Sequence, residues 1–170
     1  MLASLPAFTE GDWIVHRQYG IGQIKKREEK TISGRCEEYY RVQTPDSVVW
    51  LPVNKLDQSW FRPIATPTDF HEAINILQKP PNQMDANFMN RKDRINRVQT
   101  ENSIPAIAQL IRDLCGRRSH KSLSDTEQRA LRHLTERFIA EWSVSTNIDI
   151  SMARNQFNGF INGTQRQLIN

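Results

Sequence analysis

Long hydrophobic runs are missing from the sequence: no apolar stretch approaches the roughly 18 residues that a helix needs to cross a bilayer. Residues 1–10 carry no basic segment followed by an apolar core, so we expect no signal peptide. Cysteine is scarce. Cys36 and Cys115 stand neither in a Cys-x-x-Cys pair nor beside a histidine cluster. These absences favour free thiols in a reducing cytoplasm over a membrane-spanning or disulfide-stapled protein.

The sequence also lacks the motifs of the common active sites. It has no Walker A loop, no Gly-x-Gly-x-x-Gly fingerprint and no Gly-x-Ser-x-Gly elbow. The adjacent acids Glu28-Glu29 and Glu37-Glu38 lie in expected strands, where neighbouring side chains point to opposite faces and cannot act as a carboxylate pair. The histidines stand singly, without metal-ligand spacing, at His16, His71, His120 and His133. We therefore expect a binding protein, not an enzyme, with no metal and no other cofactor.

What is present is the composition of an ordinary globular protein. The 170 residues, 38% hydrophobic and 25% charged, suffice for one domain or two small ones. The net charge of +4 is unevenly placed, because residues 88–98 hold four cations and one acid. Such a cluster indicates a local anion-facing surface better than a general coating for nucleic acid.

β-Favouring residues dominate the first 66 positions, beginning with Trp13, Ile14 and Val15. A Gly20-x-Gly22 corner follows, and glycine suits a corner because it accepts positive φ and close approach of another strand. We expect strands near residues 13–15, 21–32, 36–44, 48–53 and 60–64, with a tight turn at Ser33-Gly34. Five short strands separated by turns are typical of a small antiparallel barrel or curled sheet.

The apolar period changes from 2 to 3.6 residues near residue 66. Thr66 resembles an N-cap, with proline next and Asp69 at the third helical position. Residues 124–127 read Ser-Asp-Thr-Glu, a capping box for a later helix. We expect helices over residues 66–79, 86–99, 103–116, 124–142 and 152–161, with Gly116 ending the third. The chain is predicted to be an α+β multidomain protein, with a barrel over residues 1–66 and a helical domain over residues 67–170.

Two surfaces of the expected barrel are candidates for partner binding. The charged run Lys25–Lys30 is either a strand edge open to β-augmentation or a solvated edge whose lysines prevent aggregation. Trp50 alternates with Val49 and Leu51 and therefore faces the opposite side. If these two neighbours are core residues, Trp50 is an exposed hot spot; otherwise Trp50 is in the core and its neighbours lie outside.

In the helical half, residues 87–92 (Asn-Phe-Met-Asn-Arg-Lys) place an apolar side chain at a helix start beside two cations. Arginine and lysine pair with phosphates, and an apolar side chain can insert at a base step in the minor groove. The alternative is that Phe88 packs on Ile95 while the cations form a solvated face. The residues alone favour this alternative.

The stretch from Phe8 to Gly22, with Gly-Asp-Trp-Ile-Val-His-Arg-Gln-Tyr-Gly-Ile-Gly at its end, resembles the opening of the CarD-like family. These are bacterial RNA polymerase-binding regulators that share their N-terminal domain with the transcription-repair coupling factor. The likeness covers nearly the whole chain and weakens after about Trp142. It continues through Thr31-Ile32-Ser33-Gly34, Glu38-Tyr39-Tyr40, Val49-Trp50-Leu51-Pro52-Val53, Asn87-Phe88-x-x-Arg91-Lys92, Ile111-Arg112-Asp113-Leu114 and Leu123-Ser124-x-x-Glu127.

The resemblance implies a Tudor-like or SH3-like barrel followed by a compact all-α domain of five helices. In the family, the barrel docks on the RNA polymerase β subunit. The helical domain meets promoter DNA at the upstream edge of the melted bubble and stabilises the open complex. Carried over by motif, the polymerase-binding residues would be Lys30 and Trp50. The DNA-binding residues would be Asn87, Phe88, Arg91, Lys92 and Arg129.

The sequence departs from the family pattern in ways that weaken its attraction for DNA. Phe88 stands where a tryptophan wedge is common and lacks the indole N–H. Asn90-Arg91 replaces two adjacent basic residues, Trp50 stands where a basic residue is frequent, and Gln128 replaces another cation. We therefore expect weak binding to DNA alone, with tethering to polymerase supplying most of the effective affinity.

The resulting hypothesis is a non-enzymatic transcription regulator that acts as a monomer, is cytoplasmic and nucleoid-associated, and makes no membrane contact. Its partners would be RNA polymerase and promoter DNA. The alternative is an interaction module that binds polymerase or another partner without touching DNA. Salt separates the two, because a DNA contact weakens steeply with salt and an apolar protein contact much less.

Overall fold

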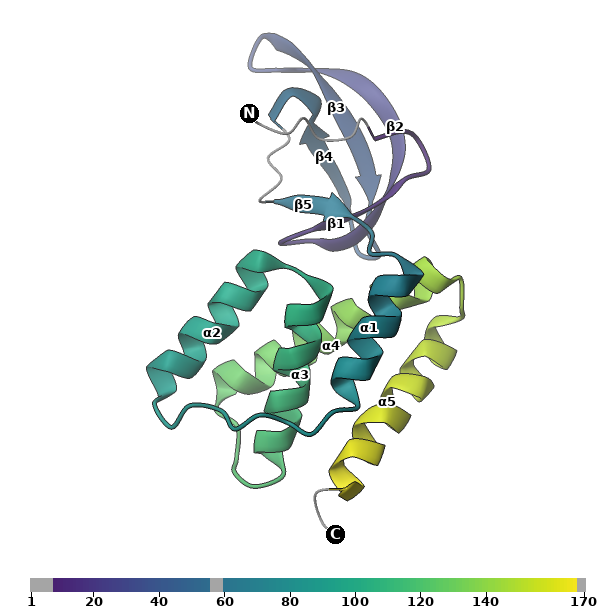
Figure 1. The fold of residues 1–170 in the computed structure, drawn as a ribbon. Helices are drawn as coiled ribbons and strands as arrows, with labels where there is room; N and C mark the ends of the chain where they lie inside the picture. The colour runs from purple at the N-terminus through teal and green to yellow at the C-terminus, as the bar shows by residue number, and fades with distance from the viewer. Residues whose placement is uncertain (1–7, 56–59, 168–170) are drawn as a thin grey trace, which may run out of the picture. The chain divides into compact units, whose positions relative to one another are not determined.

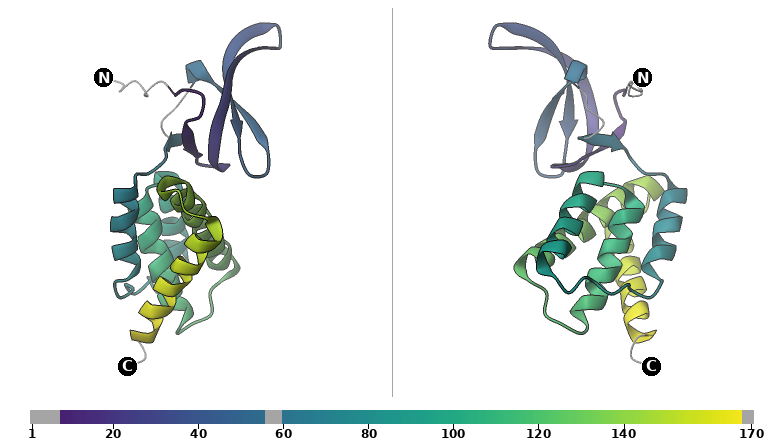
Figure 2. Two further views of the ribbon diagram at one scale, coloured as in Figure 1. Left: turned by 90° about the vertical axis from the view of Figure 1, so that its right-hand side faces the viewer. Right: turned by 60° about the vertical axis from the view of Figure 1, so that its left-hand side comes forward.

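A computed structural model describes residues 8–55 and 60–167. The chain divides between Ile64 and Ala65 into two compact units, which we call the sheet domain and the helical domain. Figures 1 and 2 show a curled sheet in the first and packed helices in the second. Each domain has its own hydrophobic core, and each is described separately below.

The described part of the sheet domain contains five antiparallel strands in the spatial order β4-β3-β2-β1-β5. Their bounds are β1 (Trp13–His16), β2 (Gly20–Ile32), β3 (Arg35–Gln43), β4 (Val48–Pro52) and β5 (Phe61–Pro63), and a 3-10 turn, Val53–Lys55, follows β4. This confirms the predicted small antiparallel sheet of a Tudor-like domain. Among the described residues the sheet is curled but not closed into a barrel, because its edge strands β4 and β5 do not pair.

Local backbone requirements explain where this sheet turns and bends. Ser33 and Gly34, at the tip of the β2–β3 hairpin, have positive φ angles of 52° and 78°, as a two-residue type I′ turn demands. Gly22 lies so close to β3 that a Cβ there would stand 2.6 Å from Cγ1 of Val42. A bulge after Ile24 adds a bend to β2. The turn expected at Ser33-Gly34 is therefore confirmed.

One face of the sheet closes over a small apolar core. The Tyr40 hydroxyl donates a hydrogen bond of 3.0 Å to the carbonyl oxygen of Phe8, which ties the segment before β1 to the sheet. The core consists of Phe8, Ile14, Ile24, Tyr40, Val42, Leu51 and Phe61. The opposite face of β2, β3 and β4 is left to residues outside this core.

The described part of the helical domain contains five α-helices, which confirms the predicted helical half. They are α1 (Pro67–Leu77), α2 (Phe88–Glu101), α3 (Ile104–Arg118), α4 (Asp125–Thr146) and α5 (Ile150–Gln167). The expected N-caps are present: Thr66 and Ser124 each form a reciprocal capping box, with Asp69 and Glu127, and Ser103 caps α3. Within the described ranges, no helix is both long and apolar enough to span a membrane.

The central element of this domain is α3, which lies between α1 and α2 in Figure 1. Every residue from Leu110 to Gly116 is buried, so α3 is surrounded where an ordinary amphipathic helix would face solvent. Phe70 of α1 and Phe138 of α4 meet edge to face in the same core, with ring centroids 5.3 Å apart. The helices α1, α2 and α4 are therefore positioned largely by their packing on α3, whereas α5 packs mainly against α4.

The prediction that Gly116 ends the third helix was wrong, because α3 continues to Arg118. Gly116 has a packing role instead. A Cβ at this position would lie 2.4 Å from Cβ and Cγ of Pro81, in the segment that joins α1 to α2. The glycine lets this connection pass directly over α3, and that connection leads to the start of α2.

We predict that Gly116→Ala lowers the free energy of unfolding of the helical domain by about 1–3 kcal/mol, the usual cost of overpacking. The matched control is Gly159→Ala in α5, where an added Cβ meets nothing within 4 Å. That change raises stability by up to about 1 kcal/mol through helix propensity. Denaturant unfolding followed by helix circular dichroism measures both. Equal stability of the two variants would contradict a close approach at Gly116.

Candidate functional site

Trp50 lies on the outer face of the sheet. Its neighbour Leu51 is buried in the core, while Trp50 itself is 38% exposed. In the strand register, Trp50 is opposite Arg41, and Arg41 is opposite Lys26, so the three side chains form a row across one face. Of the two orientations left open by the sequence, the structure has the one with Trp50 outside.

Lys30 and Glu28 hold this exposed indole in place. The Lys30 Nζ lies over the Trp50 ring, 3.4 Å from its centroid, which is a close cation–π contact. The Trp50 Nε1–H donates a hydrogen bond of 2.7 Å to Oε1 of Glu28. This hydrogen bond and the positive charges of Lys26 and Lys30 hold the pKa of Glu28 below its ordinary value, against the opposing effect of desolvation. We call Glu28, Lys30 and Trp50 the outer-face cluster.

The structure thus brings together the two residues predicted to bind polymerase and adds a third. Glu28 was considered as part of the charged run Lys25–Lys30 and of a possible catalytic dyad, but its contact with Trp50 was not predicted. The available signal was the spacing of Glu28 and Lys30, which are two apart on a strand and so share a face.

The charged run Lys25–Lys30 lies along a partly open edge. β1 pairs with β2 only at Gly20–Gln23, and among the described residues no strand pairs with the other side of β2 beyond that point. The Glu10 carboxylate accepts a long hydrogen bond of 3.4 Å from the Arg27 backbone N–H there. The geometry is compatible with both interpretations given above, strand addition and a guarded edge.

Phe88 is the first residue of α2 and is 40% exposed, so it is not part of the helical core. The side-chain oxygen of Asn87, the N-cap, accepts a hydrogen bond of 2.8 Å from the Met89 N–H. Met89 is also exposed, whereas Ile95 is buried in the core. Asn87 therefore fixes the helix start, and two apolar side chains project from it.

Arg91 faces the protein rather than solvent. Its side chain is only 7% exposed. Its Nε donates to Oε1 of Glu127 at 2.7 Å, and its Nη1 donates to the carbonyl oxygens of Asp85 and Ala86 at 2.9 and 2.8 Å. The guanidinium also lies 5.7 Å from the centroid of the Phe88 ring. The Arg91 side chain therefore holds the turn beneath Phe88 and offers little free surface of its own.

Glu127 is the buried partner at the centre of this arrangement, with a side chain 1% exposed. Besides Arg91, its carboxylate accepts a 2.8 Å hydrogen bond from the Ser124 N–H and lies 3.2 Å from Nε of Arg117. Burial raises the pKa of Glu127, but hydrogen bonds with Ser124 and the Arg91 charge outweigh it and leave the pKa below its ordinary value. The residue recognised in the sequence as a helix cap is also an internal anchor for α2.

Asp113 on α3 holds the same region from the other side. This fully buried carboxylate accepts hydrogen bonds of 2.9 Å from the Asn82 N–H, 2.6 Å from Arg94 Nη2 and 2.8 Å from Arg112 Nε. Asn82 belongs to the connection before α2, and Arg94 to α2 itself. Two buried carboxylates, Glu127 and Asp113, therefore position the start of α2.

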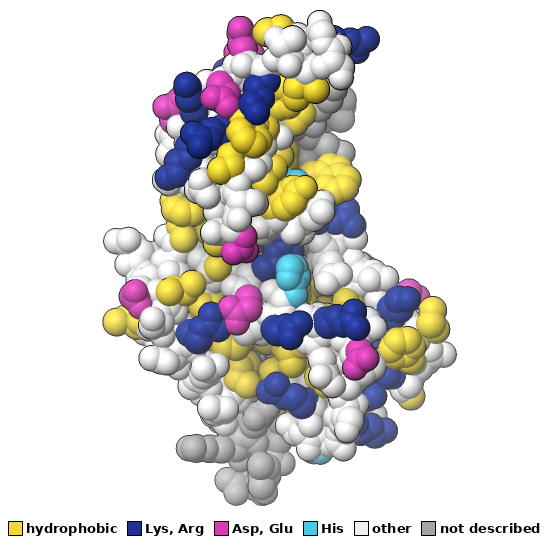
Figure 3. All heavy atoms as spheres, turned by 180° about the vertical axis from the view of Figure 1, so that it is seen from behind, with side chains coloured by type: hydrophobic (Ala, Val, Ile, Leu, Met, Phe, Trp, Pro, Cys, Tyr) yellow, Lys and Arg dark blue, Asp and Glu magenta, His cyan; other side chains and the backbone are white. Residues whose placement is uncertain are grey.

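Lys92 and Arg129 are exposed and make no ion pair within the described parts of the chain. Lys92 is one turn after Phe88 on α2. Arg129 is on α4 and lines a groove of about 530 Å³ between α2 and α4, together with Asn96 and Gln99 of α2. Figure 3 shows Lys and Arg side chains recurring across one face of the helical domain. Acidic side chains lie among these cations, and the sheet domain likewise shows cations and acids together in this view.

Among the described residues, no three His, Cys, Asp or Glu side chains are grouped so that they could hold a metal ion. Cys36 is exposed and Cys115 buried, both as free thiols. Burial raises the pKa of the Cys115 thiol, which opposes formation of a reactive thiolate. Two exposed aromatic side chains held by charged neighbours, Trp50 in the outer-face cluster and Phe88 at the start of α2, remain the candidate sites.

Two protein-family models match the chain. The CarD-like/TRCF RID domain matches residues 8–65, and the CarD C-terminal domain matches residues 72–158. A curated relative, named "Putative transcription factor YdeB", from Bacillus subtilis (strain 168), is 27% identical over 144 residues. That alignment covers 83% of this chain and 94% of the relative.

The buried ion pair beneath Phe88 yields a stability prediction. Glu127→Gln leaves the buried Arg91 guanidinium without its countercharge, so the free energy of unfolding at neutral pH falls by about 3 kcal/mol. The control Glu136→Gln breaks an exposed pair with Arg154 and costs about 0.5 kcal/mol.

The pH dependence has a defined sign. The pKa of Glu127 is lower in the folded protein than its ordinary value, so its stabilising effect is complete above about pH 4.3, the unfolded value, and is lost as the pH falls through the folded pKa. Unfolding of wild type and Glu127→Gln at several pH values measures this. If the difference in unfolding free energy between wild type and Glu127→Gln stays constant as the solution is made acidic, Glu127 is not charged in the folded protein.

Proposed function

The chain belongs to the CarD-like family, and from this membership we propose that it is a transcription regulator that interacts with RNA polymerase. Both family models support this proposal, because one matches the sheet domain and the other matches the helical domain. The finer proposal has two parts: the sheet domain binds the polymerase β subunit, and the helical domain stabilises the promoter open complex. The protein acts as a monomer in the cytoplasm, associated with the nucleoid.

The polymerase contact is assigned to the outer-face cluster. An exposed tryptophan is a common hot spot of protein interfaces. Here the Lys30 ammonium and the Glu28 carboxylate hold the Trp50 indole before any partner arrives. Pre-organisation lowers the entropy cost of binding, because the side chain loses little freedom on docking.

The DNA contact is assigned to Phe88, with Lys92 and Arg129 as phosphate partners. The observation that carries this proposal is the exposure of Phe88 at the start of a helix that Arg91 and Asn87 hold in place. An apolar side chain placed in this way can insert at an unstacked base step at the edge of the bubble. Exposed cations nearby add sequence-independent attraction to phosphates. Arg91 contributes by positioning rather than by contact.

This arrangement makes tethering essential. A single phenylalanine wedge with two exposed cations gives modest affinity for DNA at physiological salt. Docking of the sheet domain on polymerase raises the effective concentration of the helical domain at the promoter. The protein is therefore proposed to act on polymerase-bound promoters rather than on free DNA.

The first test of this proposal measures open-complex lifetime on a promoter with bacterial RNA polymerase. Wild-type protein lengthens the lifetime, and Phe88→Ala removes most of the increase, because the apolar wedge is lost. Phe88→Trp retains or enlarges the effect. The matched control is Met89→Ala, which truncates an exposed neighbour on the same helix. If Phe88→Ala binds polymerase and still lengthens the lifetime as wild type does, the wedge assignment fails.

The second test measures affinity for polymerase. Trp50→Ala weakens binding by about thirtyfold or more, the effect of losing a hot spot worth about 2 kcal/mol. Glu28→Ala weakens it less, since the indole remains but is no longer held. Trp60→Ala removes another exposed tryptophan of the sheet domain and serves as the control. If Trp50→Ala and Trp60→Ala weaken polymerase binding equally, the outer-face cluster is not the specific polymerase contact.

The second candidate function is an interaction module without DNA contact, favoured by the exposed pair Phe88 and Met89, which also suits an apolar protein interface. Salt dependence of the lifetime effect distinguishes the two. A DNA contact loses its effect steeply between low and physiological salt, whereas an apolar protein contact changes little.

A further inference from the structure

A small cavity lies where the connection between α1 and α2 passes over the end of α3, and it has a volume of about 370 Å³. That size is at the lower end of the range of about 300–1,000 Å³ that small-molecule sites occupy. The connection contributes Pro81, Met84 and Ala86 to the wall, and the end of α3 and the turn after it contribute Arg117, His120 and Lys121. We call it the connection cavity.

The two sides of the connection cavity differ in chemistry. Pro81, Met84 and Ala86 present apolar groups, whereas Arg117 and Lys121 are cations, and no Asp or Glu lines the wall. No Phe, Tyr or Trp lines it either, so it offers no indole or phenyl face on which a nucleobase could stack. The wall therefore matches a small molecule that carries a negative charge at one end and an apolar group at the other.

The positive charge of Arg117 is incompletely balanced. Its side chain is only 16% exposed, and its Nε lies 3.2 Å from Oε1 of Glu127. The same oxygen is already paired with Nε of Arg91 at 2.7 Å, so two guanidinium groups share one carboxylate. The buried Nε of Arg117 has no hydrogen-bond partner within the described residues. Because a buried charge needs a countercharge and a buried donor needs an acceptor, an anion beside Arg117 is favoured.

The other acids near the connection are engaged elsewhere. The Asp85 carboxylate accepts hydrogen bonds of 3.0 Å from Nδ2 of Asn90 and 2.7 Å from the Asn87 N–H, and these bonds, with the Arg91 charge, hold its pKa below the ordinary value. The buried Asp113 carboxylate is likewise shared by two arginine side chains. Neither carboxylate lines the connection cavity, so neither supplies the anion that its wall lacks.

We propose that the connection cavity binds a small organic anion, whose carboxylate or phosphate group pairs with Arg117 and Lys121 and whose apolar chain packs on Pro81 and Met84. A guanidinium group suits this role, because its planar fork donates to two oxygens of one anion. Such a ligand contacts both α3 and the connection, so its binding stabilises the segment that leads to α2. The site needs neither polymerase nor DNA and goes beyond the proposed function.

The experiment titrates the isotope-labelled full chain with small probes and follows its amide chemical shifts by NMR. The probes are hexanoate, hexyl phosphate, hexylammonium and inorganic phosphate. We expect saturable shifts centred on residues 81–86 and 116–121 with hexanoate or hexyl phosphate, and the tighter of the two identifies the anionic group. Hexylammonium has the same chain with the opposite charge, and inorganic phosphate has no chain. Both bind at least about tenfold more weakly.

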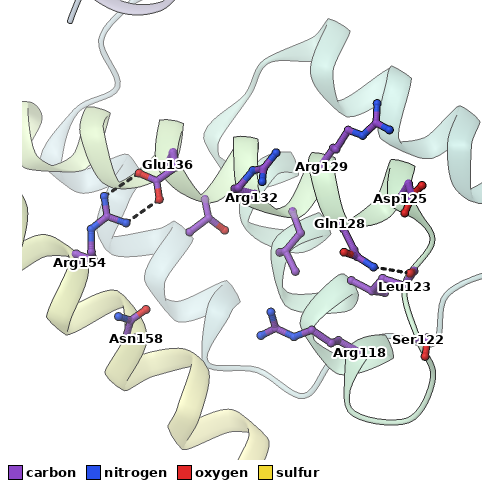
Figure 4. A pocket seen from close by; sticks show the side chains of 12 residues that line it. Arg118, Ser122, Leu123, Asp125, Gln128, Arg129, Arg132, Glu136, Arg154 and Asn158 are labelled. Atoms are coloured by element: carbon purple, nitrogen blue, oxygen red, sulfur yellow. Dashed lines mark hydrogen bonds and ion pairs between the residues drawn. The ribbon is translucent and has the colours of Figure 1, made fainter.

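Variants test which side chains bind the anion. Arg117→Gln weakens binding of the tighter probe by about tenfold or more, the effect of losing a charge-assisted hydrogen bond. Lys121→Gln changes an exposed residue, leaves the core untouched and weakens binding by about threefold, as for an exposed ion pair. The matched control Arg118→Gln leaves binding unchanged. Figure 4 shows Arg118 extending from α3 into a separate groove along α4 and α5.

Four results would overturn the inference. Equal affinity for hexylammonium and the two hexyl anions would show that charge is not selected. Equal affinity for inorganic phosphate and hexyl phosphate would show that the apolar side plays no part. Absence of shifts at residues 81–86 and 116–121, or wild-type affinity in both Arg117→Gln and Lys121→Gln, would remove the site. Each result is obtained without polymerase or promoter, so the proposed function is tested separately.

Discussion

The ion pair between Arg91 and Glu127 is the constraint on which the helical surface depends. It is almost wholly buried, so both charges give up hydration and are retained only because each finds several partners. Glu127 closes the capping box of α4, and Arg91 holds the carbonyl groups just before α2. The same pair thus fixes two helix starts relative to each other. The direction of Phe88 follows from it, because Phe88 begins α2 above the Arg91 guanidinium.

The outer-face cluster uses the same physical device in a more exposed setting. A cation lies over the Trp50 ring and a carboxylate accepts its N–H. In both domains, then, an exposed aromatic side chain is held by charged neighbours instead of by burial in a core. This arrangement suits binding surfaces, since an aromatic hot spot that is already ordered loses little entropy when a partner covers it. The two surfaces lie in domains matched by the two family models.

Much of the fold could be predicted from the sequence because its local signals agree with one another. The capping boxes at Thr66 and Ser124, the turn at Ser33-Gly34 and the change of apolar period all led to elements that the structure contains. The prediction that Gly116 ends α3 was wrong; it was made because a glycine near a helix end commonly marks a terminus. Its actual reason is the approach of Pro81, which is remote in sequence and has no local signature.

The candidate surfaces were harder to predict, because they too depend on contacts between residues that are remote in sequence. The sequence places Arg91 among cations that suit a solvated or DNA-facing surface, and its burial depends on Glu127, which is 36 residues away. Glu28 acquires its role only through Trp50, 22 residues further along the chain. The sequence pattern and the family resemblance together supplied Lys30, Trp50 and Phe88, but neither could show which neighbours hold them.

The central claim is that Phe88 contacts promoter DNA when the protein is bound to polymerase. Its most direct test places a photoreactive phenylalanine analogue at position 88 and irradiates the complete polymerase–promoter complex. The account predicts a crosslink to promoter DNA at the upstream edge of the bubble, and predicts its loss when Trp50→Ala prevents docking. Crosslinks to protein alone, in complexes that retain this chain, would contradict it.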